Sequence, residues 1–422
     1  MNIHSMDKST AAAQLRELMA EYEKVKAKGL KLDMSRGKPC SEQLSLADPM
    51  LNILTPDECF GSADYRNYGI LDGIPEAKAL FAQLLGVSAD NVIVGGNSSL
   101  QLMYDAVARC MLYGHAGGKP WKDQGKIKFI APVPGYDRHF GICESLGIEM
   151  INVAMTDDGP DMDEVERIVK SDASVKGMWN VPKYSNPGGA VYSEETVKRL
   201  ASMECAAEDF LLMWDNAYVV HSLSGNIAEI PEILSECAKA GNPDRVIEFV
   251  STSKMGYPGA GVAALASSVD NVKRIKSVMA FQTIGYDKIN QLRCVKFFKN
   301  ADGIKAHMRK HADILRPKFE AVNEVLAREL GDSGAGSWKN VDGGYFISYY
   351  THKNCAKRTV ALCREAGVTL TDAGATFPLG IDPEDSNIRI APSLPPVEEL
   401  KTAIEVLALC SRIAALEKKC EA

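Results

Sequence analysis

The sequence predicts an α/β protein, with a large domain whose mostly parallel sheet is covered by helices on both faces and a smaller α+β domain. Two observations predict this architecture. Between residues 92 and 286, short and nearly continuous apolar runs alternate with amphipathic helical segments. After residue 286 the pattern changes to long helical stretches, and a chain of 422 residues is too long for one small core. We expect residues 50–295 to form the large domain, and residues 1–49 and 296–422 to form the small one.

The elements of the large domain follow one another as strand, loop and helix. A helix is expected at Pro75–Leu85, with proline in its first turn and Gly86 at its end. Strands are expected at Val92–Val94, Ile127–Ile130, Met150–Val153, Gly177–Val181, Phe210–Trp214 and Val246–Val250. Helices between them are expected at Ser98–Leu112, Asp163–Lys170 and Glu194–Cys205. This alternation is typical of a parallel sheet that is buried on both faces.

The small domain is expected to be discontinuous in sequence. Helical spacing of apolar residues predicts a helix over Thr10–Lys28, stopped by Gly29, which has no core of its own. We therefore expect it to complete the C-terminal unit. That unit should contain helices up to Leu326, a strand pair around Gly344–Tyr350, a strand near Val368–Leu370 and a last helix at Val397–Lys418.

Composition excludes several classes of protein. A net charge of −7 and a pI near 5.7 argue against nucleic acid as the main ligand. No apolar run is long enough to span a bilayer, and residues 1–31 lack the apolar stretch of a signal peptide. The 11 cysteines are scattered without a C-x-x-C pair, so neither disulfides nor a metal site are expected. These features predict a cytoplasmic protein with reduced thiols.

Polar and glycine-rich segments follow the predicted strands. In an open parallel sheet, ligands bind beyond the carboxyl ends of the strands, so these segments should meet at one edge. Gly95–Ser99 opens a helix after the first strand, which suits either an anion site or a simple turn with an N-cap. The segments after later strands are Pro132–Tyr136, Pro182–Gly189, Asp215–Tyr218 and the stretch that contains Lys254.

Lys254 is the most informative residue of this set. It follows an apolar strand and two hydroxyl residues, Ser251 and Ser253, and it precedes a glycine-rich turn. Lysine is almost never buried without a partner. Its position at the mouth of the sheet therefore suggests an amine held for Schiff-base chemistry beside an anion site, the alternative being a surface lysine at a strand end.

The ordered set of motifs resembles the class I (fold type I) aminotransferases that depend on pyridoxal 5'-phosphate, over nearly the whole chain. The motifs are Tyr184-Ser-Asn-Pro-Gly-Gly189, then Asp215-x-x-Tyr218, then Ser251-x-Ser-Lys254. Each motif is weak alone, but their order and spacing are those of the family. Together with Ser35–Pro39 and the glycine turn after the lysine, they are most similar to a bacterial branch of aspartate aminotransferases.

The resemblance implies a role for each matching residue. Lys254, Asp215 and Tyr218 would be catalytic: the lysine would form the Schiff base, the aspartate would pair with the pyridine nitrogen, and the tyrosine would bind the phenolic oxygen. Asn186 would share that oxygen, and Tyr136 would stack on the ring. The phosphate would be bound by Asn97, Ser98, Ser99, Ser251 and Ser253, and by Tyr68 reaching across from the other subunit of a homodimer.

The resemblance also implies the substrate contacts and the reaction. Arg389 and the backbone of Gly37 would bind the substrate α-carboxylate, with Asn186 beside it. The implied reaction is a ping-pong transfer of an amino group from aspartate or glutamate to a 2-oxo acid. Two alternatives stay open: a lyase or decarboxylase using the same cofactor, and an amino-acid-sensing regulator, which would need a basic DNA-binding domain before the first helix.

Two departures from the family pattern affect the expected site. The family usually has a phosphate-binding arginine eight positions after the lysine, but this chain reads Gly259-Ala-Gly-Val262 there. The residue after the ring aspartate is Asn216 rather than an acidic one. A dicarboxylic substrate also needs a second cation, for which Arg36, Lys38 and Arg138 are candidates; each is equally compatible with a solvated surface position.

Overall fold

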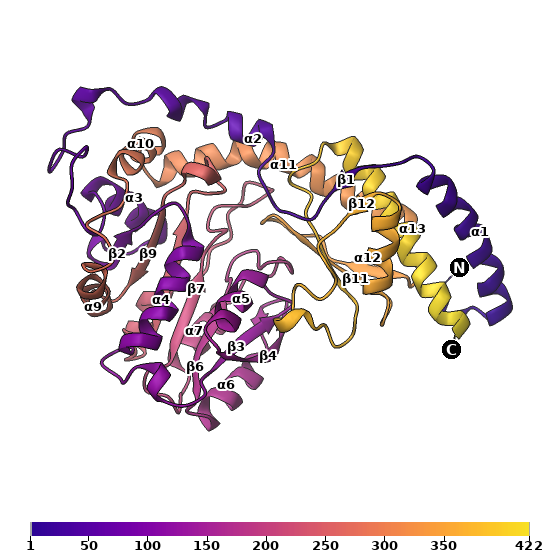
Figure 1. Ribbon diagram of the computed structural model, residues 1–422, viewed down its shortest axis with the longest axis horizontal. Helices are drawn as coiled ribbons and strands as arrows, with labels where there is room; N and C mark the ends of the chain where they lie inside the picture. Colours follow the sequence, from indigo (N-terminus) through magenta and orange to yellow (C-terminus); the bar gives the residue numbers. More distant parts are fainter. Residues whose placement is uncertain (1, 422) are drawn as a thin grey trace.

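The computed structural model describes residues 2–421, and its centre is an eight-stranded sheet (Figure 1). The strands lie in the order β2-β9-β8-β7-β6-β3-β4-β5. Their bounds are β2 Val92–Val94, β3 Lys128–Val133, β4 Glu149–Thr156, β5 Gly159–Pro160, β6 Val175–Asn180, β7 Leu211–Asp215, β8 Val246–Ser251 and β9 Ala263–Ser267. The neighbours among β8, β7, β6, β3 and β4 are parallel, which confirms the predicted mostly parallel sheet.

Strand β9 was not predicted from the sequence. It lies between β2 and β8 and is antiparallel to both. Its residues are mostly alanines, Ala263, Ala264 and Ala266, and they are fully buried. Alanine has a weak preference for strands, and the run lacks the β-branched and aromatic residues that identified the other strands. Burial between two neighbouring strands, and not local preference, therefore makes this segment a strand.

Helices cover both faces of the sheet. Alternate residues of each strand point to opposite sides, and on the central strands both sets of side chains are apolar and buried. On β7, Leu212 and Trp214 pack in one core cluster with α3, α6, α7 and α8, whereas Leu211 and Met213 pack in another with α4, α5 and α9. The bounds are α3 Pro75–Leu85, α4 Ser99–Tyr113, α5 Asp137–Ser145, α6 Met162–Ser171, α7 Glu194–Ser202, α8 Ile233–Lys239, α9 Val269–Met279 and α10 Lys288–Phe298. Gly86 adopts the left-handed conformation that ends α3, as predicted.

A third core cluster joins the two ends of the chain. It contains Leu18 and Tyr22 of the N-terminal helix with residues of the C-terminal helices, and the Tyr22 hydroxyl donates to the Leu362 carbonyl at 2.9 Å. Helices α1 and α13 lie side by side, with both termini at the right-hand end of Figure 1. The helices are α1 Lys8–Lys26, α2 Ser41–Ser45, α11 Ala301–Glu329, α12 Ala356–Glu365 and α13 Val397–Glu421. The domain boundaries near residues 49 and 295 stay a prediction.

Two small sheets belong to this third cluster. The strand pair expected around residues 344–350 is a three-stranded antiparallel sheet in the order β10-β11-β13, and the strand near residue 368 pairs in parallel with an N-terminal strand. Their bounds are β1 Leu32–Asp33, β10 Gly336–Trp338, β11 Ile347–Thr351, β12 Val368–Thr369 and β13 Asn387–Ile390. Within residues 2–421, no helix combines the length and the apolar character needed to cross a membrane.

Candidate active site

A large cavity opens beyond the carboxyl ends of the central strands, where the main sheet meets the C-terminal unit. Its volume is about 640 Å³. It collects most of the predicted site residues, which lie far apart in the sequence. The predicted residues that line it are Gly37, Ser98, Ser99, Tyr136, Asn186, Asp215, Tyr218, Ser251, Ser253, Lys254 and Arg389.

Lys254 lies in the turn after β8, and its amine faces this cavity. Its Nζ lies 4.9 Å from the ring centroid of Tyr218 and 5.9 Å from that of Tyr345. Among residues 2–421, no carboxylate lies within ion-pair distance of this amine. Burial lowers the pKa of the Lys254 amine below its ordinary value, although the negative charge of Asp215 acts in the opposite direction. A lowered pKa makes the uncharged, nucleophilic amine available at lower pH.

Asp215 ends β7 and presents one free carboxylate oxygen. Its Oδ2 lies 2.9 Å from Nε2 of His139, and both side chains are nearly inaccessible to solvent, at 4% and 2% exposed. Its Oδ1 is also buried and has no hydrogen-bond partner in the part of the chain that the structure describes. A buried oxygen without a donor is costly, so this geometry suits a ligand that brings an N–H group or a positive charge.

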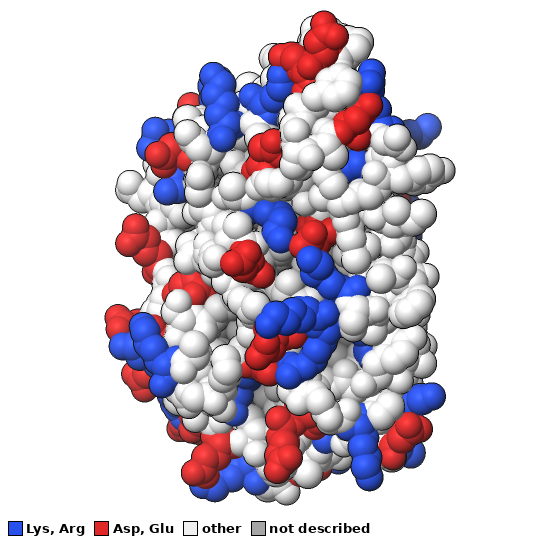
Figure 2. Space-filling view, turned by 90° about the vertical axis from the view of Figure 1, so that its left-hand side faces the viewer, with Lys and Arg blue, Asp and Glu red and all other residues white. Residues whose placement is uncertain are grey.

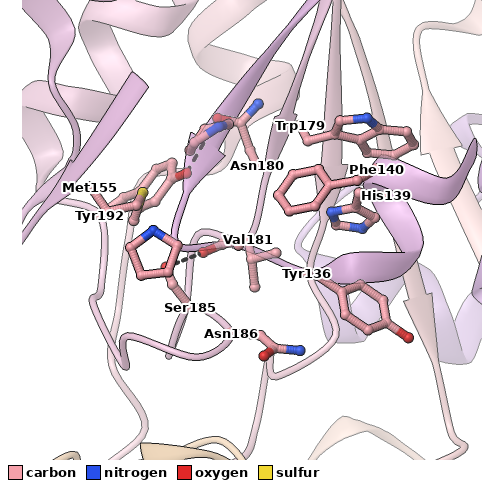
Figure 3. A pocket seen from close by; sticks show the side chains of 13 residues that line it. Tyr136, His139, Phe140, Met155, Trp179, Asn180, Val181, Ser185, Asn186 and Tyr192 are labelled. Carbon is pink, nitrogen blue, oxygen red and sulfur yellow. Dashed lines mark hydrogen bonds between the residues drawn. The ribbon is translucent and has the colours of Figure 1, made fainter. Parts of the chain in front are cut away.

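His139 holds Asp215 and was not identified from the sequence. Figure 3 shows its imidazole lying parallel to the Trp179 indole, with ring centroids 4.3 Å apart and planes 6° apart. The Tyr136 ring meets the same imidazole edge-on at 5.0 Å. His139 follows Tyr136 by three residues in the first turn of α5, a spacing that places two side chains on one helix face. This three-residue spacing from Tyr136 is the sequence signal that could have pointed to His139.

Arg389 lies on β13 and lines the same cavity. Its side chain is only 8% exposed and stacks over the Phe346 ring at 4.8 Å. Its Nη1 donates to Oδ1 of Asp137 at 2.8 Å, with Oδ1 of Asn186 at 3.5 Å. Gly37 packs against the same ring, since a Cβ atom there would lie 2.5 Å from Cζ of Phe346. Any larger residue at position 37 would therefore displace the Phe346 ring, on which the Arg389 guanidinium stacks.

The predicted phosphate-binding residues meet at the start of α4. Ser98 is the N-cap of this helix, and its side chain makes no capping hydrogen bond, so the first N–H groups lack that partner. Ser98 and Ser99 both line the cavity. The Ser251 hydroxyl donates to Ser253, whose hydroxyl donates to the Asn97 carbonyl, each at 3.2 Å. Asn97 thus contributes its backbone carbonyl here, and it is not among the residues that line the cavity.

The resemblance places a phosphate-binding arginine at position 262, where this chain has valine. No arginine of the segment around this position lines the cavity. Apart from Lys254, the lining cations are Arg36, Lys38, Arg138, Arg364 and Arg389. Arg36, Lys38 and Arg138 are exposed. Arg364 pairs with Asp372 at 2.6 Å. At the serine end, the described chain therefore offers hydroxyl groups and a helix N-terminus, together with Lys254.

Tyr68 lies outside this cavity. Its side chain is 83% exposed, and it lines a separate surface hollow with neighbours such as Arg66, Ile284 and Lys288. The single chain therefore does not bring Tyr68 to the other predicted phosphate-binding residues. A role for Tyr68 at a phosphate requires a second copy of the chain.

Comparisons of this chain with known proteins agree on one family. The family model for aspartate amino-transferase matches residues 6–422. A putative aminotransferase of Mycolicibacterium smegmatis is 45% identical over 99% of both chains. An aspartate aminotransferase of Corynebacterium glutamicum is 45% identical, covering 95% of this chain and 93% of its own. The crystal structure of an aspartate transaminase from Corynebacterium glutamicum superposes with a TM-score of 0.97 at 43% identity and 99% coverage of both chains.

Proposed function

Since the chain belongs to the aspartate aminotransferase family, we propose that its cavity binds pyridoxal 5'-phosphate and transfers the amino group of aspartate or glutamate to a 2-oxo acid. The chain is an aminotransferase, and its family implies this cofactor. One observation carries the proposal: the Lys254 amine and the free Oδ1 of Asp215 line the same cavity as the buried Arg389 guanidinium. These groups are an amine nucleophile, an anion for a protonated ring nitrogen and a carboxylate receptor.

The residues present fit this cofactor. When bound, pyridoxal phosphate supplies a conjugated ring that accepts the electron pair of a deprotonated substrate carbon. Asp215 would keep the pyridine nitrogen protonated through its free Oδ1, while His139 holds its Oδ2 in place. Tyr136 would lie on one face of the ring. The serines and the start of α4 would bind the phosphate, with the helix N-terminus favouring its negative charge.

The chain's own groups then divide the remaining work. Lys254, once free, would move the proton from the substrate α-carbon, because its lowered pKa leaves more of the amine uncharged. Tyr218 is buried, and burial raises its pKa well above the ordinary value, so its hydroxyl keeps its proton and would donate a hydrogen bond to the phenolic oxygen. Asn186 would share that oxygen. Arg389 would fix the substrate by a two-pronged bond to its α-carboxylate.

The family match favours transamination over the elimination and decarboxylation that the same cofactor supports in other proteins, because it spans residues 6–422. It also favours an enzyme over an amino-acid-sensing regulator. We further propose a cytoplasmic location. All 11 cysteines of the chain are free thiols in the structure, which agrees with a reducing compartment.

The preference for a dicarboxylic substrate is tested by a panel of amino donors. Aspartate and glutamate should aminate the cofactor faster than leucine, alanine or phenylalanine, as followed by the change in cofactor absorbance. Replacing the responsible cation among Arg36, Lys38 and Arg138 by alanine should lower kcat/KM for aspartate by about 10- to 100-fold, because a charge-assisted hydrogen bond is lost. The same change should leave leucine unaffected. Equal rates for neutral and acidic donors would contradict the preference.

We propose that the active form is a homodimer in which each copy contributes Tyr68 to the other copy's phosphate. Ile284, which lines the same hollow as Tyr68, is 63% exposed, and Phe281, three residues before it, is 94% exposed. These are large apolar groups to leave in water. The helices α3, α9 and α10 of this region lie at the left-hand end of Figure 1. Figure 2 shows that face, where acidic and basic side chains are interspersed among extensive uncharged areas.

Mixing two inactive variants tests the shared site. Lys254→Ala and Tyr68→Ala proteins are unfolded together, refolded and assayed at a cofactor concentration too low to load Tyr68→Ala alone. In the mixed dimer, one site has both an intact Lys254 and an intact Tyr68, so about a quarter of wild-type activity per site should return. Sedimentation should show a dimer. An active monomer, or no recovery in a mixture that sediments as a dimer, would contradict the shared site.

A further inference from the structure

The proposed receptor for the substrate carboxylate already holds a carboxylate of the chain itself. Oδ1 of Asp137 accepts from Nη1 of Arg389 at 2.8 Å. The two residues are 252 positions apart in sequence, and both line the main cavity. In the proposed function the α-carboxylate of the substrate would make the same type of bond to the same guanidinium. Asp137 holds Nη1, while the buried Nε of the same guanidinium has no partner among the described residues. A two-pronged bond that uses Nη1 therefore requires Asp137 to leave.

The two partners differ in how firmly they are held. The Arg389 side chain is 8% exposed, stacks over Phe346 and projects from β13, which is paired along its length with β11. The Asp137 side chain is 34% exposed and lies in the first turn of a helix at the cavity wall. A buried guanidinium without a partner is strongly unfavourable, whereas a half-exposed carboxylate can turn toward water. Exchange is therefore expected to move Asp137 and leave Arg389 in place.

The released Asp137 carboxylate has two other favourable contacts. Nε of Arg138 lies 4.0 Å from its Oδ2. Asp137 is also the first residue of α5, where the free N–H groups of the helix N-terminus attract a negative charge. When Asp137 leaves Arg389, its negative charge therefore keeps favourable contacts. The free-energy cost of the exchange is thus moderate.

We propose that Asp137 occupies the substrate-carboxylate position on Arg389 in the ligand-free protein and that the α-carboxylate of the incoming substrate displaces it. This inference rests on the proposed function of Arg389. Asp137 keeps the empty cavity neutral at this point and admits only a ligand with a carboxylate that can replace its own. A carboxylate ligand binds only molecules in which Asp137 has left Arg389. Its apparent affinity is therefore the intrinsic affinity multiplied by the fraction of such molecules.

The test measures the binding of succinate, a dicarboxylate without an amino group, to cofactor-loaded protein by calorimetry. The variants are Asp137→Ala, which removes the competitor, and Asp137→Asn, which removes its charge and keeps its size. Each should bind succinate about tenfold more tightly than the wild type, as expected if about a tenth of the molecules have a free receptor. Glu144→Gln is the matched control, since it removes one negative charge from the same helix, where Glu144 bonds to the Leu379 N–H at 2.9 Å. It should change the affinity by less than about twofold.

The same measurement in an Arg389→Ala background separates this inference from the proposed function. Adding Asp137→Ala to Arg389→Ala should give no further change, because the two residues act through one contact. Unchanged or weaker binding by both Asp137 variants, an equal gain from Glu144→Gln, or a gain that persists without Arg389 would each overturn the inference. If Arg389→Ala alone bound succinate as the wild type does, the proposed role of Arg389 would itself be wrong.

Discussion

Replacing Lys254 with alanine is expected to abolish turnover, with kcat lower by at least about 10⁴-fold, because both the nucleophile and the proton carrier are lost. The fold should survive the change. The amine forms no ion pair within residues 2–421 and lies against the Tyr218 and Tyr345 rings, so its removal leaves no partner uncompensated. The measurements are steady-state kinetics with aspartate and 2-oxoglutarate, and a thermal melt of each protein.

A second lysine provides the control for this prediction. Lys183 is also partly buried, burial lowers the pKa of its amine, and its Nζ donates to the Val219 carbonyl at 3.4 Å, but it does not line the main cavity. Lys183→Ala should therefore keep turnover near the wild-type level. If Lys254→Ala remained active while Lys183→Ala did not, the reactive amine would be assigned to the wrong residue.

Replacing Asp215 is expected to have the second largest effect. Asp215→Asn should slow the exchange of the substrate α-proton with solvent deuterium by about 10²- to 10⁴-fold, because the amide carries no charge to keep the ring nitrogen protonated. The exchange is followed by NMR with aspartate alone, which isolates the first half of the reaction. Substrate binding through Arg389 should change little, so the loss should appear in the rate and not in the affinity.

The two Asp215 variants separate its chemical role from its structural one. Asp215→Asn retains an oxygen for the 2.9 Å contact with His139, whereas Asp215→Ala leaves that buried histidine without its partner. Asp215→Ala should therefore lose about 1–3 kcal/mol of unfolding free energy that Asp215→Asn largely keeps. Both should be equally slow in proton exchange. Near-normal exchange in Asp215→Asn would assign the ring nitrogen to another carboxylate.

The sequence predicted the parts of the structure that depend on local pattern. Strand β2 and helix α3 begin and end at the predicted residues, because a bounded apolar run and a proline–glycine pair are local signals. Helix α1 begins at Lys8, two residues before the predicted start, because Asp7 caps it through the Thr10 N–H. Strand β9 was not predicted, because its alanines have little intrinsic preference for a strand and are held in one by pairing with β2 and β8.

The candidate site could be predicted only where a motif carried it. The motifs led to Lys254, Asp215 and Asn186, which line one cavity. They did not lead to His139 or Asp137, because the partners of these residues, Asp215 and Arg389, lie 76 and 252 positions away. Pairing at such separation depends on the fold, since it follows from which strands end at the same edge. Tyr68 is exposed and lies outside the main cavity of the single chain, so its proposed role at a phosphate stays a prediction.

Borohydride reduction followed by peptide mapping tests whether Lys254 is the residue that binds the cofactor covalently. The protein is loaded with pyridoxal phosphate, reduced, digested and analysed by mass spectrometry. We expect the phosphopyridoxyl mass on the peptide that contains Lys254, at a stoichiometry of one per chain, and its absence in Lys254→Ala treated in the same way. A label on any other lysine, or a protein that takes up no cofactor, would show that Lys254 does not have this role.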